Sequence, residues 1–501
     1  MNLVAMLDMN ARKFADKDCL RYNGKSFSYR ALKETAERGA AVLQSRGVRK
    51  NDKIALMSQN TPSFVFAFYA VMKAGAVAVP INHKLMPPEV QYILDHSDSK
   101  LIFFDGSLVP VVSKVSTTAV KVAMDSAAEG FERFESLLEK AREFVPVEVF
   151  DEDLAEILYT SGTTGKPKGC LHTQRSVIMA AATGALAVKL DRHDRLLMAM
   201  PIWHSSPLNN WFMGTQYVGG VTVMIREYHP LHFLKAVQDE KCTVYFGAPV
   251  SYILPIKTVP QFSEFDLTSM RCWIYGGGPM AADTALMVMK TYKSDNFYQV
   301  YGMTEAGPTG TVLFPDEQVH KAGSIGNMAL PGADMITVRI DGRQAGPGDV
   351  GEICLRADSM MKGYFKDDAA TREAFKAGWY HTGDLARIDE DGYLFIVDRI
   401  KDMIVTGGEN VYSREVEDAI ATCPGVMEAA VVGLPDPDWG EIVTAFVVPH
   451  KDQQADPDTI KAFLADKLAK FKIPRVIHLV DSLPHTPSGK VMKFELRERF
   501  R

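Results

Sequence analysis

The segment Tyr159–Gly169, with the sequence YTSGTTGKPKG, is rich in residues that can bind phosphate. Glycines let backbone N–H groups turn toward an anion, hydroxyl side chains add donors, and lysines add positive charge. The segment is not a Walker A loop, because only two residues separate Gly162 from the Gly165–Lys166 pair and no serine or threonine follows the lysine. The same residue types are common in flexible surface loops, so composition alone leaves a phosphate cradle and a surface loop both open.

Five other segments are rich in glycine, hydroxyl or charged residues. They are Tyr275–Met280 (YGGGPM), Gln299–Gly307 (QVYGMTEAG), Gly378–Ala386 (GWYHTGDLA), Asp398–Val411 (DRIKDMIVTGGENV) and Thr486–Lys493 (TPSGKVMK). With the first segment, they resemble the ordered motifs of the adenylate-forming superfamily, which comprises acyl-CoA synthetases, peptide-synthetase adenylation domains and firefly-type luciferases. One such match is weak, but six in the same order over nearly the whole chain are specific. The resemblance implies an AMP-forming acyl-CoA synthetase that uses ATP, Mg²⁺ and coenzyme A.

The resemblance implies that Tyr301 lies against the adenine ring, that Thr304 contacts the α-phosphate and that Glu305 holds Mg²⁺. A hard cation prefers carboxylate oxygen, so the residue type fits, although a glutamate taken alone is usually a solvated surface charge. The other phosphate- and nucleotide-binding residues implied in these two motifs are Thr160, Ser161, Gly162, Thr163, Thr164, Gly165, Lys168, Gln299 and Gly302.

The base and the ribose have their own implied contacts. Gly276, Gly277 and Gly278 resemble the segment that passes along adenine, where a side chain would obstruct the base. Asp384 resembles the carboxylate that accepts hydrogen bonds from the ribose hydroxyls, and Arg399 a second ribose contact. Taken alone, a Gly-Asp pair is also common turn chemistry, and an arginine is commonly a surface residue.

Lys490 is implied as the catalytic lysine. The attacking carboxylate and the α-phosphate are both anions, so a cation between them offsets charge where the transition state develops it. Without the motif, a lysine in a Ser-Gly turn is usually exposed and idle. The resemblance also implies a rotation of a small domain about a hinge at Lys401, after which Gly407–Asn410, including Gly408, faces the active site.

His204, in MPIWHSSPLNNWF, matches a position that guards the acyl pocket in the family, although a histidine beside Trp203 also fits simple packing. We expect Trp211, Phe246 and Tyr275 to line that pocket, with bulky walls that favour a short, medium or aromatic acid. The sequence does not identify the acid. No aspartate or glutamate occurs from residue 200 to 221, which disfavours an amino-acid substrate, since its ammonium group would lie unpaired.

Coenzyme A is the favoured acyl acceptor. Trp439, Phe471, Lys472 and Arg475 resemble positions that contact its nucleotide end, and an aromatic ring with cations suits a phosphorylated adenosine. Packing is the alternative role for Trp439. A stand-alone enzyme that loads a carrier protein and a catalytically silent nucleotide-binding scaffold remain the alternative functions, and a luciferase-like oxidation has no independent support.

The elements that position these residues follow from the wider pattern. In the 501-residue chain, Ser28 can cap a helix to about Ser45, a strand follows at Lys53–Met57, Thr61 and Pro62 open a second helix, and Ala76–Pro80 reads as a strand. Such alternation favours α/β structure with mostly parallel, helix-covered sheets. Asp-Gly pairs at 341–342 and 391–392 indicate hairpins in a small β-barrel-like part.

We expect a large N-terminal domain over residues 1–398 and a small, mobile α+β domain over 399–501, with strands near Glu428–Val432 and Val443–Val448 and a helix capped by Asp456. A length of 501 residues is too great for one core.

The composition limits the partners. With 56 basic and 62 acidic residues, the net charge is −6, which argues against nucleic acid as a partner. The six cysteines are scattered and suit reduced thiols in a cytoplasmic protein. The apolar stretch Phe64–Ile81 contains Lys73, a glycine and a proline, so we expect a buried helix, a turn and a strand rather than a membrane segment. The expected partners are a small carboxylic acid and coenzyme A, with a homodimer left open.

Overall fold

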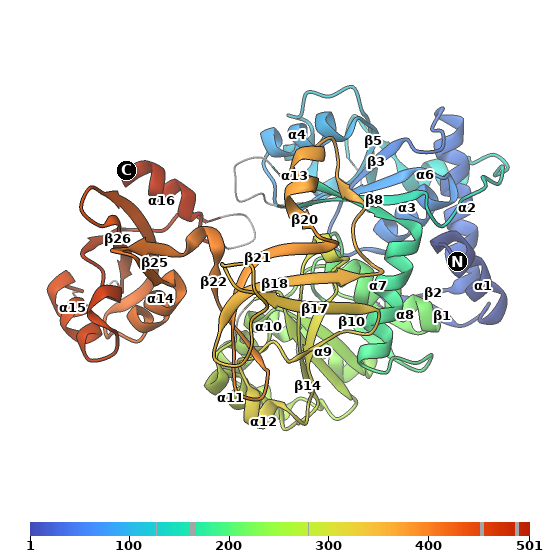
Figure 1. Cartoon of the computed structure of the whole chain (residues 1–501). Helices are drawn as coiled ribbons and strands as arrows, with labels where there is room; N and C mark the ends of the chain where they lie inside the picture. Colours follow the sequence, from blue (N-terminus) through green and yellow to red (C-terminus); the bar gives the residue numbers. More distant parts are fainter. Residues whose placement is uncertain (127, 161–166, 279, 451–454, 486–489, 501) are drawn as a thin grey trace. The chain divides into compact units, whose positions relative to one another are not determined.

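The computed structural model describes residues 1–126, 128–160, 167–278, 280–450, 455–485 and 490–500. By their contacts these residues fall into two compact units (Figure 1). The first unit contains Met1–Thr160, Pro167–Met335 and Leu355–Tyr380, and the second contains Ile336–Cys354 and His381–Arg501. The boundary expected between residues 398 and 399 therefore falls inside the second unit.

Two large, mostly parallel sheets build the first unit. The nine-stranded sheet runs in the order β16 (Met328–Ala329), β15 (Gly310–Leu313), β14 (Phe297–Gly302), β13 (Cys272–Gly276), β12 (Val244–Gly247), β10 (Arg195–Met198), β11 (Val221–Met224), β1 (Asp18–Tyr22), β2 (Lys25–Ser28). The eight-stranded sheet runs β19 (Gly363–Tyr364), β9 (Lys168–Thr173), β8 (Leu154–Thr160), β4 (Val77–Pro80), β3 (Lys53–Met57), β5 (Ser99–Asp105), β6 (Val120–Met124), β7 (Glu132–Arg133).

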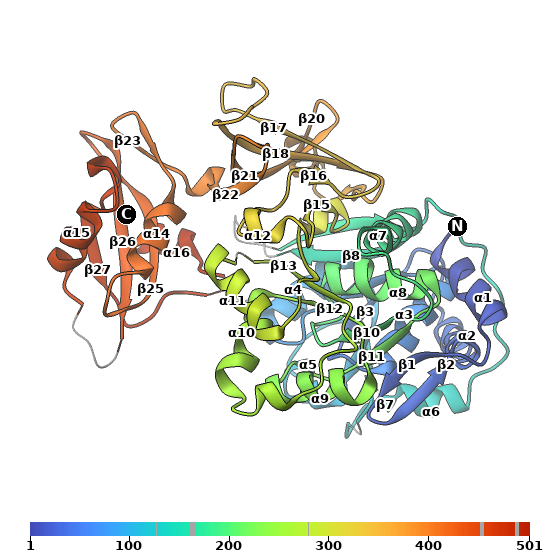
Figure 2. The ribbon, with the colours of Figure 1, turned by 90° about the horizontal axis from the view of Figure 1, so that it is seen from below.

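Helices cover both faces of these sheets. The main core takes residues from both sheets and from α1 (Leu3–Lys13), α2 (Tyr29–Ser45), α3 (Pro62–Lys73), α6 (Phe134–Glu139), α7 (Gln174–Ala187), α8 (Met213–Val218) and the π-helix η2 (Ser206–Phe212). The outer face of the eight-stranded sheet packs against α4 (Pro87–Ser97) and α5 (Val109–Val112). The outer face of the nine-stranded sheet packs against α9 (Pro230–Glu240), α10 (Pro249–Thr258) and α11 (Ala282–Tyr292) (Figure 2). The short α12 (Gln318–Lys321) and α13 (Asp368–Ala374) complete the unit.

The strand β3 illustrates why a strand in this unit can carry apolar side chains on both of its faces. Its Ile54 and Leu56 enter the core shared by the two sheets, while Ala55 and Met57 enter the core under α4. Successive side chains of a strand point to opposite faces, and both faces of this sheet are covered by helices. The parallel, helix-covered architecture predicted from the alternation of elements is confirmed.

Local chemistry sets the helix ends as expected. The hydroxyl of Ser28 accepts a hydrogen bond from the N–H of Ala31, and Thr61 accepts one from Phe64 at the start of α3. Gly47 follows α2 with φ +75°, a left-handed conformation that suits glycine. The stretch Phe64–Ile81 forms most of α3 and the strand β4, both buried. Among the described residues, no helix is long and apolar enough to cross a membrane.

A third, curled sheet runs β17 (Ala333–Val338), β18 (Val350–Ala357), β21 (Trp379–Ile388) and β20 (Phe375–Lys376), and β22 (Leu394–Arg399) pairs with β21. The division into units runs through this sheet. The turn between β21 and β22 contains Gly392 with φ +84°, as expected from the Asp-Gly pair. This sheet is the β-barrel-like part predicted from the sequence.

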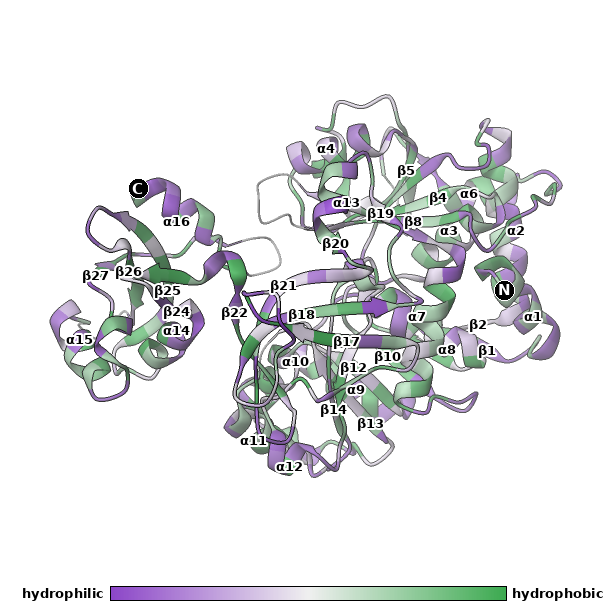
Figure 3. Ribbon diagram, viewed as in Figure 1, coloured by the Kyte–Doolittle hydropathy of each residue, from purple (hydrophilic) through white to green (hydrophobic). Residues whose placement is uncertain are grey.

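The rest of the second unit is a small α+β module. Its sheet runs β24 (Glu409–Val411), β23 (Ile404–Thr406), β26 (Gly440–Pro449) and β25 (Val426–Asp436), with β27 (Val476–Leu479) beside β26. The helices are α14 (Ser413–Ala421), α15 (Pro457–Ala465) and α16 (Lys493–Phe500). In Figure 3, β25 is largely hydrophobic and α16 largely hydrophilic, which fits a sheet with helices on its surface.

Candidate active site

Most of the expected site residues of the first unit lie at or near one edge of the nine-stranded sheet, whereas Thr160 and Lys168 lie on strands of the eight-stranded sheet. Strands β10, β12, β13 and β14 are parallel neighbours, so their carboxyl ends share that edge. Gly276 ends β13, Gly277 and Gly278 follow it, and the 3₁₀ turn η4 (Thr304–Ala306) follows β14. The segment with His204 and Ser205 lies between β10 and η2. Ligands of open α/β sheets bind outside the carboxyl ends of the strands, so this edge is the candidate site.

The Thr304 hydroxyl has a buried partner. Its Oγ1 lies 2.9 Å from Oγ of Ser205, whose side chain is almost fully buried. A hydrogen bond between the two hydroxyls limits the rotation of Thr304 and leaves its oxygen aimed in one direction. Sequence reasoning missed Ser205, although it directly follows His204, a residue it had singled out.

Glu305 is held on both its side chain and its backbone. The hydroxyl of Tyr364 donates to Oε1 of Glu305 at 3.1 Å, and the N–H of Met361 donates to its carbonyl oxygen at 2.9 Å. Burial, followed by the Glu305 charge, raises the pKa of Tyr364, which keeps this hydroxyl protonated as a donor. The ammonium of Lys168 lies 5.0 Å from the centre of the Tyr364 ring. A half-buried carboxylate that is held in place in this way is a suitable ligand for Mg²⁺.

The three glycines of YGGGPM differ in why, or whether, the structure requires a residue without a side chain. A Cβ on Gly276 would lie 2.4 Å from the carbonyl oxygen of Val300, so β13 could not keep its place beside β14. Gly277 has φ +74°, which disfavours any residue with a side chain. At Gly278, a Cβ would meet Pro249 alone among the described residues, at 3.7 Å. The space beside Gly278 therefore suits a flat ligand. At Gly276 and Gly277, the protein fold alone already requires glycine.

The remaining nucleotide-binding candidates of the first unit lie on its strands. Gln299 is buried and Tyr301 is half-buried on β14, opposite Leu313 and Thr311. A Cβ on Gly302 would lie 2.5 Å from the carbonyl oxygen of Pro308. Thr160 ends β8 and lies opposite Lys168 on β9. Ser161, Gly162, Thr163, Thr164 and Gly165 lie outside the described residues.

The aromatic candidates for the acyl pocket separate into two groups. Trp211 on η2 and Phe246 on β12 are buried and stacked, with ring centres 5.4 Å apart and planes at 23°. Tyr275 belongs instead to the core under α9–α11, where its hydroxyl donates to Gln318 at 2.9 Å. His204 is exposed, with its ring 5.7 Å from that of Trp203. Trp211 and Phe246 thus form one aromatic wall, and Trp211 donates to the hydroxyl of Ser206, the residue after Ser205, at 3.1 Å.

A buried carboxylate reaches η2 from another element. Asn209 on η2 donates to Oε1 of Glu156 at 2.6 Å, and Glu156 lies opposite His172 in the pairing of β8 and β9. Burial raises the pKa of Glu156 to about 7 and lowers the pKa of His172 to about 4. An acidic side chain therefore contacts η2 although no acidic residue occurs between 200 and 221.

In the second unit, Asp384 and Arg399 form an ion pair. Arg399 Nε donates to Oδ1 of Asp384 at 2.7 Å, and its Nη2 donates to the carbonyl oxygen of Thr382 at 3.3 Å. The two residues lie opposite each other where β21 pairs with β22. The Asp384 side chain is only 15% exposed. Both predicted ribose contacts are thus together, with the arginine orienting the carboxylate.

Lys401 lies in the turn η5 (Ile400–Asp402) after β22, and the residue as a whole is exposed. Burial of its ammonium lowers the pKa of Lys401 to about 8. The negative charge of Asp402 raises this pKa, and nearby positive charges lower it further. Asp402 itself pairs with Arg497 at 2.9 Å. Gly408 is exposed with φ +86° in the turn between β23 and β24.

The aromatic and basic candidates for coenzyme A lie within the same module. The Arg475 guanidinium lies 3.9 Å from the ring centre of Trp439, and the Trp439 and Phe471 residues are 44% and 40% exposed. Lys472 donates to both carboxylate oxygens of Glu415, at 2.7 and 2.8 Å. The exposed tryptophan with its stacked guanidinium could receive a flat, anionic ligand.

Lys490 is exposed in the second unit, just before α16. An isolated antiparallel bridge pairs His485 with Val491, the residue that follows Lys490. The other members of its motif up to Gly489 lie outside the described residues.

Comparison with known proteins identifies the family. Residues 7–365 match the model of the AMP-binding enzyme, and residues 415–490 match that of the AMP-binding enzyme C-terminal domain. The chain belongs to the family of AMP-binding enzymes.

Relatives within this family cover nearly the whole chain. A long-chain-fatty-acid–CoA ligase, FadD13, of Mycobacterium tuberculosis is 36% identical over 94% of this chain and 93% of its own length. A feruloyl-CoA synthase of Amycolatopsis is 35% identical over 98% and 97%. The structure of o-succinylbenzoate CoA synthetase (MenE) from Bacillus subtilis, in complex with the acyl-adenylate intermediate OSB-AMP, has a TM-score of 0.86 at 28% identity and covers 98% of this chain and 97% of that one.

These matches confirm two predictions made from the six motifs. The chain is a member of the adenylate-forming superfamily, and the two relatives described above are CoA ligases, as expected for an AMP-forming acyl-CoA synthetase. Binding of ATP or AMP follows from the family. The roles of single residues remain proposals.

Proposed function

We propose that this AMP-binding enzyme activates a carboxylic acid and transfers its acyl group to coenzyme A. In the first step, a carboxylate oxygen attacks the α-phosphorus of ATP, the acyl–O–P bond forms and the bond to the β-phosphate breaks, which releases pyrophosphate. In the second step, the thiol sulfur attacks the acyl carbon, the bond to AMP breaks, and the thiol proton leaves to solvent.

The observation that carries this proposal is the held Thr304–Glu305 turn at the carboxyl edge of the sheet. Thr304, oriented by Ser205, would donate its hydroxyl to the α-phosphate. Glu305, oriented by Tyr364, would hold Mg²⁺. When bound, Mg²⁺ offsets the negative charge of the phosphates and of the leaving pyrophosphate. Groups that are held in place before the substrate arrives need no reorganisation during the reaction.

The remaining ATP contacts are proposed from the geometry of each unit. Tyr301 and the open space beside Gly278 would hold adenine, since flat groups pack against an aromatic ring and against glycine. Asp384, oriented by Arg399, would accept hydrogen bonds from the ribose hydroxyls. Thr160 and Lys168 would contribute to the phosphate site together with Ser161–Gly165.

Lys490 is proposed as the catalytic cation of the first step. Its exposure suits a residue that must approach a substrate rather than pack in a core. A rotation of the domain from residue 399 to 501 about Lys401 would bring Lys490 in for adenylation and Gly408 in for thioester formation. In such an arrangement, each half-reaction uses its own side of the small domain.

Trp439, Phe471 and Arg475 are proposed to hold the nucleotide end of coenzyme A. The exposed rings and the stacked guanidinium support this assignment. Lys472 would act there only if its ion pair with Glu415 opened.

The acid is proposed to be compact and either apolar or aromatic. The buried stack of Trp211 and Phe246 supports an apolar wall at the carboxyl end of β12, and the exposed His204 would guard the entrance. Cytoplasmic location and a homodimer remain predictions.

Pyrophosphate release over a panel of carboxylic acids tests the proposal. The panel contains short, medium and long fatty acids, aromatic acids and amino acids, each with and without coenzyme A. We expect release to require a compact apolar or aromatic acid and to become catalytic only with coenzyme A. Turnover that requires an added carrier protein instead would contradict the acceptor, and preference for an amino acid would contradict the acid.

A further inference from the structure

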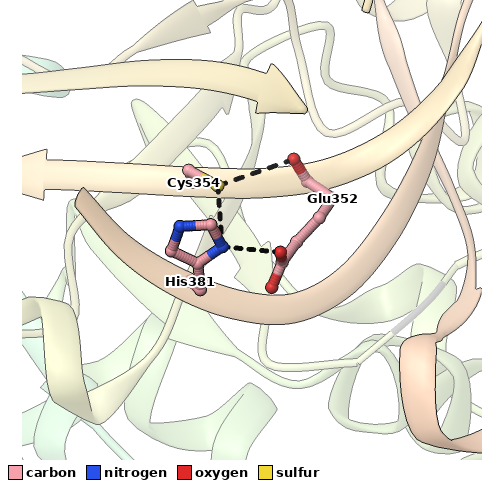
Figure 4. A group of neighbouring side chains, drawn as sticks. All are labelled: Glu352, Cys354 and His381. Carbon is pink, nitrogen blue, oxygen red and sulfur yellow. Dashed lines mark hydrogen bonds and ion pairs between the residues drawn. The ribbon is translucent and has the colours of Figure 1, made fainter. Parts of the chain in front are cut away.

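Glu352, on β18, binds the backbone of the segment that leads to Asp384. Its Oε1 accepts a hydrogen bond from the N–H of Gly383 at 2.9 Å. Its Oε2 lies 2.7 Å from Nδ1 of His381 (Figure 4). The Glu352 and His381 side chains are 16% and 21% exposed, so water competes little for these bonds.

The segment held in this way needs support. Gly383 has φ +72°, so β21 departs from extended geometry one residue before Asp384. The N–H of Asp384 donates to the Thr382 hydroxyl at 3.0 Å, and that hydroxyl donates to the carbonyl oxygen of Ile353 at 2.7 Å. Two consecutive residues of β18 therefore hold three consecutive residues of β21. Arg399 contacts Asp384 from the other side.

We propose that Glu352 is a positioning residue for ATP, because it holds the His381–Gly383 segment so that Asp384 presents its carboxylate to the ribose hydroxyls. This inference rests on the proposed function, which assigns the ribose to Asp384. Glu352 itself touches no substrate. Its effect reaches the ribose only through the backbone conformation at Gly383.

The same side chains could also suggest a metal site. Glu352, Cys354 and His381 have potential ligand atoms within 4.8 Å of one another, and Sγ of Cys354 lies 3.5 Å from Nδ1 of His381. However, Oε1 of Glu352 already accepts from Gly383, and Oε2 is at hydrogen-bond distance from His381. A network of direct hydrogen bonds accounts for the carboxylate, so we assign positioning and not metal binding.

The test measures how strongly the enzyme discriminates between ATP and its deoxy analogues. This discrimination would not change if Glu352 only stabilised the fold. Wild-type enzyme should prefer ATP to 2′-deoxy-ATP and 3′-deoxy-ATP, because a carboxylate accepts from the hydroxyls. Glu352→Ala should raise the KM for ATP by about tenfold, since a hydrogen bond to a charged group is lost, and should reduce this preference. The KM values for the acid and for coenzyme A should stay unchanged.

Glu352→Gln is the conservative variant. Its amide oxygen can still accept from Gly383, so it should retain most of the preference for ATP, and it carries the test if truncation lowers the folded fraction. Asp349→Asn is the matched control. Asp349 lies just before β18 and also accepts from a backbone N–H, that of Gly346 at 3.0 Å, and pairs with Arg339 at 2.7 Å. It should leave the preference unaltered.

Asp384→Asn separates the two levels of the claim. If Asp384→Asn loses the preference for ATP and Glu352→Ala keeps it, positioning by Glu352 is wrong while the ribose assignment stands. If Asp384→Asn keeps the preference, the ribose assignment itself is wrong and the inference fails with it. One equivalent of Zn²⁺ in the purified protein that His381→Ala removes would also overturn the inference.

Discussion

The Thr304–Glu305 turn of the first unit and the Lys490 and Trp439 regions of the second differ in how their side chains are held. In the first unit, Ser205 and Tyr364 hold the Thr304–Glu305 turn in place by hydrogen bonds to its side chains. Lys490, Trp439 and Phe471 are instead exposed on a small module. The difference suggests a division of work. In the proposed function, the groups assigned to ATP throughout the cycle are pre-oriented, while the groups assigned to one half-reaction remain accessible.

Lys490→Ala tests the exposed side of this comparison with the largest expected effect. It should slow acid-dependent pyrophosphate release by about 10²–10³-fold, because a charge-stabilising group is lost from the first transition state. Thioester formation from pre-made acyl-AMP should be largely spared. Single-turnover kinetics of each half-reaction provide the measurement, with the equally exposed Lys470→Ala as control. Equal loss in both half-reactions would contradict the division of work.

Trp439→Ala should affect the other half-reaction. Loss of an aromatic surface stacked with Arg475 should raise the KM for coenzyme A by about tenfold, while acid-dependent exchange of pyrophosphate into ATP stays unchanged. Trp439→Phe should recover part of the affinity. The exposed Met427→Ala on β25 is the control for loss of apolar surface. A rise in the KM for ATP instead would remove Trp439 from the coenzyme A site.

Ser205→Ala tests pre-orientation in the first unit. Removing one hydrogen bond from the Thr304 hydroxyl should lower kcat/KM for ATP about fivefold in the exchange reaction. Ser63→Ala is a matched control, because Ser63 is also buried and its hydroxyl also has a side-chain partner, the carboxylate of Glu135 at 3.1 Å. If the two variants behave alike, the orientation of Thr304 has no special importance.

Glu156→Gln tests how the buried carboxylate beside η2 in the first unit affects the stability of the protein. The folded-state pKa of Glu156, about 7, lies above its ordinary value of 4.5, so the folded state binds the proton more tightly than the unfolded chain. Stability from this group is therefore complete below pH 4.5 and is lost as the pH rises through 7. The glutamine has no charge to bury, so it should stabilise the protein by on the order of 2–3 kcal/mol at pH 8 and hardly at all at pH 4.5.

Urea unfolding midpoints at the two pH values measure this effect, with the exposed Glu152→Gln as control. The side-chain amide introduced by Glu156→Gln can donate to Asn209 Oδ1, which has no hydrogen-bond partner among the described residues. A gain that is the same at both pH values would show that Glu156 is not the titrating group.

Local patterns were sufficient to predict much of the fold. The caps at Ser28, Thr61 and Asp456 are where expected, because an N-cap depends on residues close in sequence. The strand Lys53–Met57 was predicted at its observed ends for a similar reason, since its apolar run is bounded by polar residues. The order of the strands within the two sheets was not predicted, since it depends on contacts between distant segments.

The site shows the same limit. Thr304, Glu305, Asp384 and Lys490 were singled out as candidates because they lie in motifs that resemble those of the family. Ser205, Tyr364 and Glu352, which orient these groups, were missed, because they lie far away in sequence from the residues that they contact. Glu156 was missed for the same reason, since it reaches η2 from β8. A side chain that acts through a neighbour carries no local signal of its own.

The central claim is that the acid attacks the α-phosphorus of ATP. A carboxylic acid labelled with ¹⁸O in both carboxylate oxygens tests this directly when the enzyme turns it over with ATP and coenzyme A. Mass spectrometry of the products should find one ¹⁸O in AMP, one in the acyl thioester and none in pyrophosphate, because the oxygen that forms the acyl–phosphate bond leaves with AMP. Label in inorganic phosphate or pyrophosphate, or none in AMP, would contradict the account.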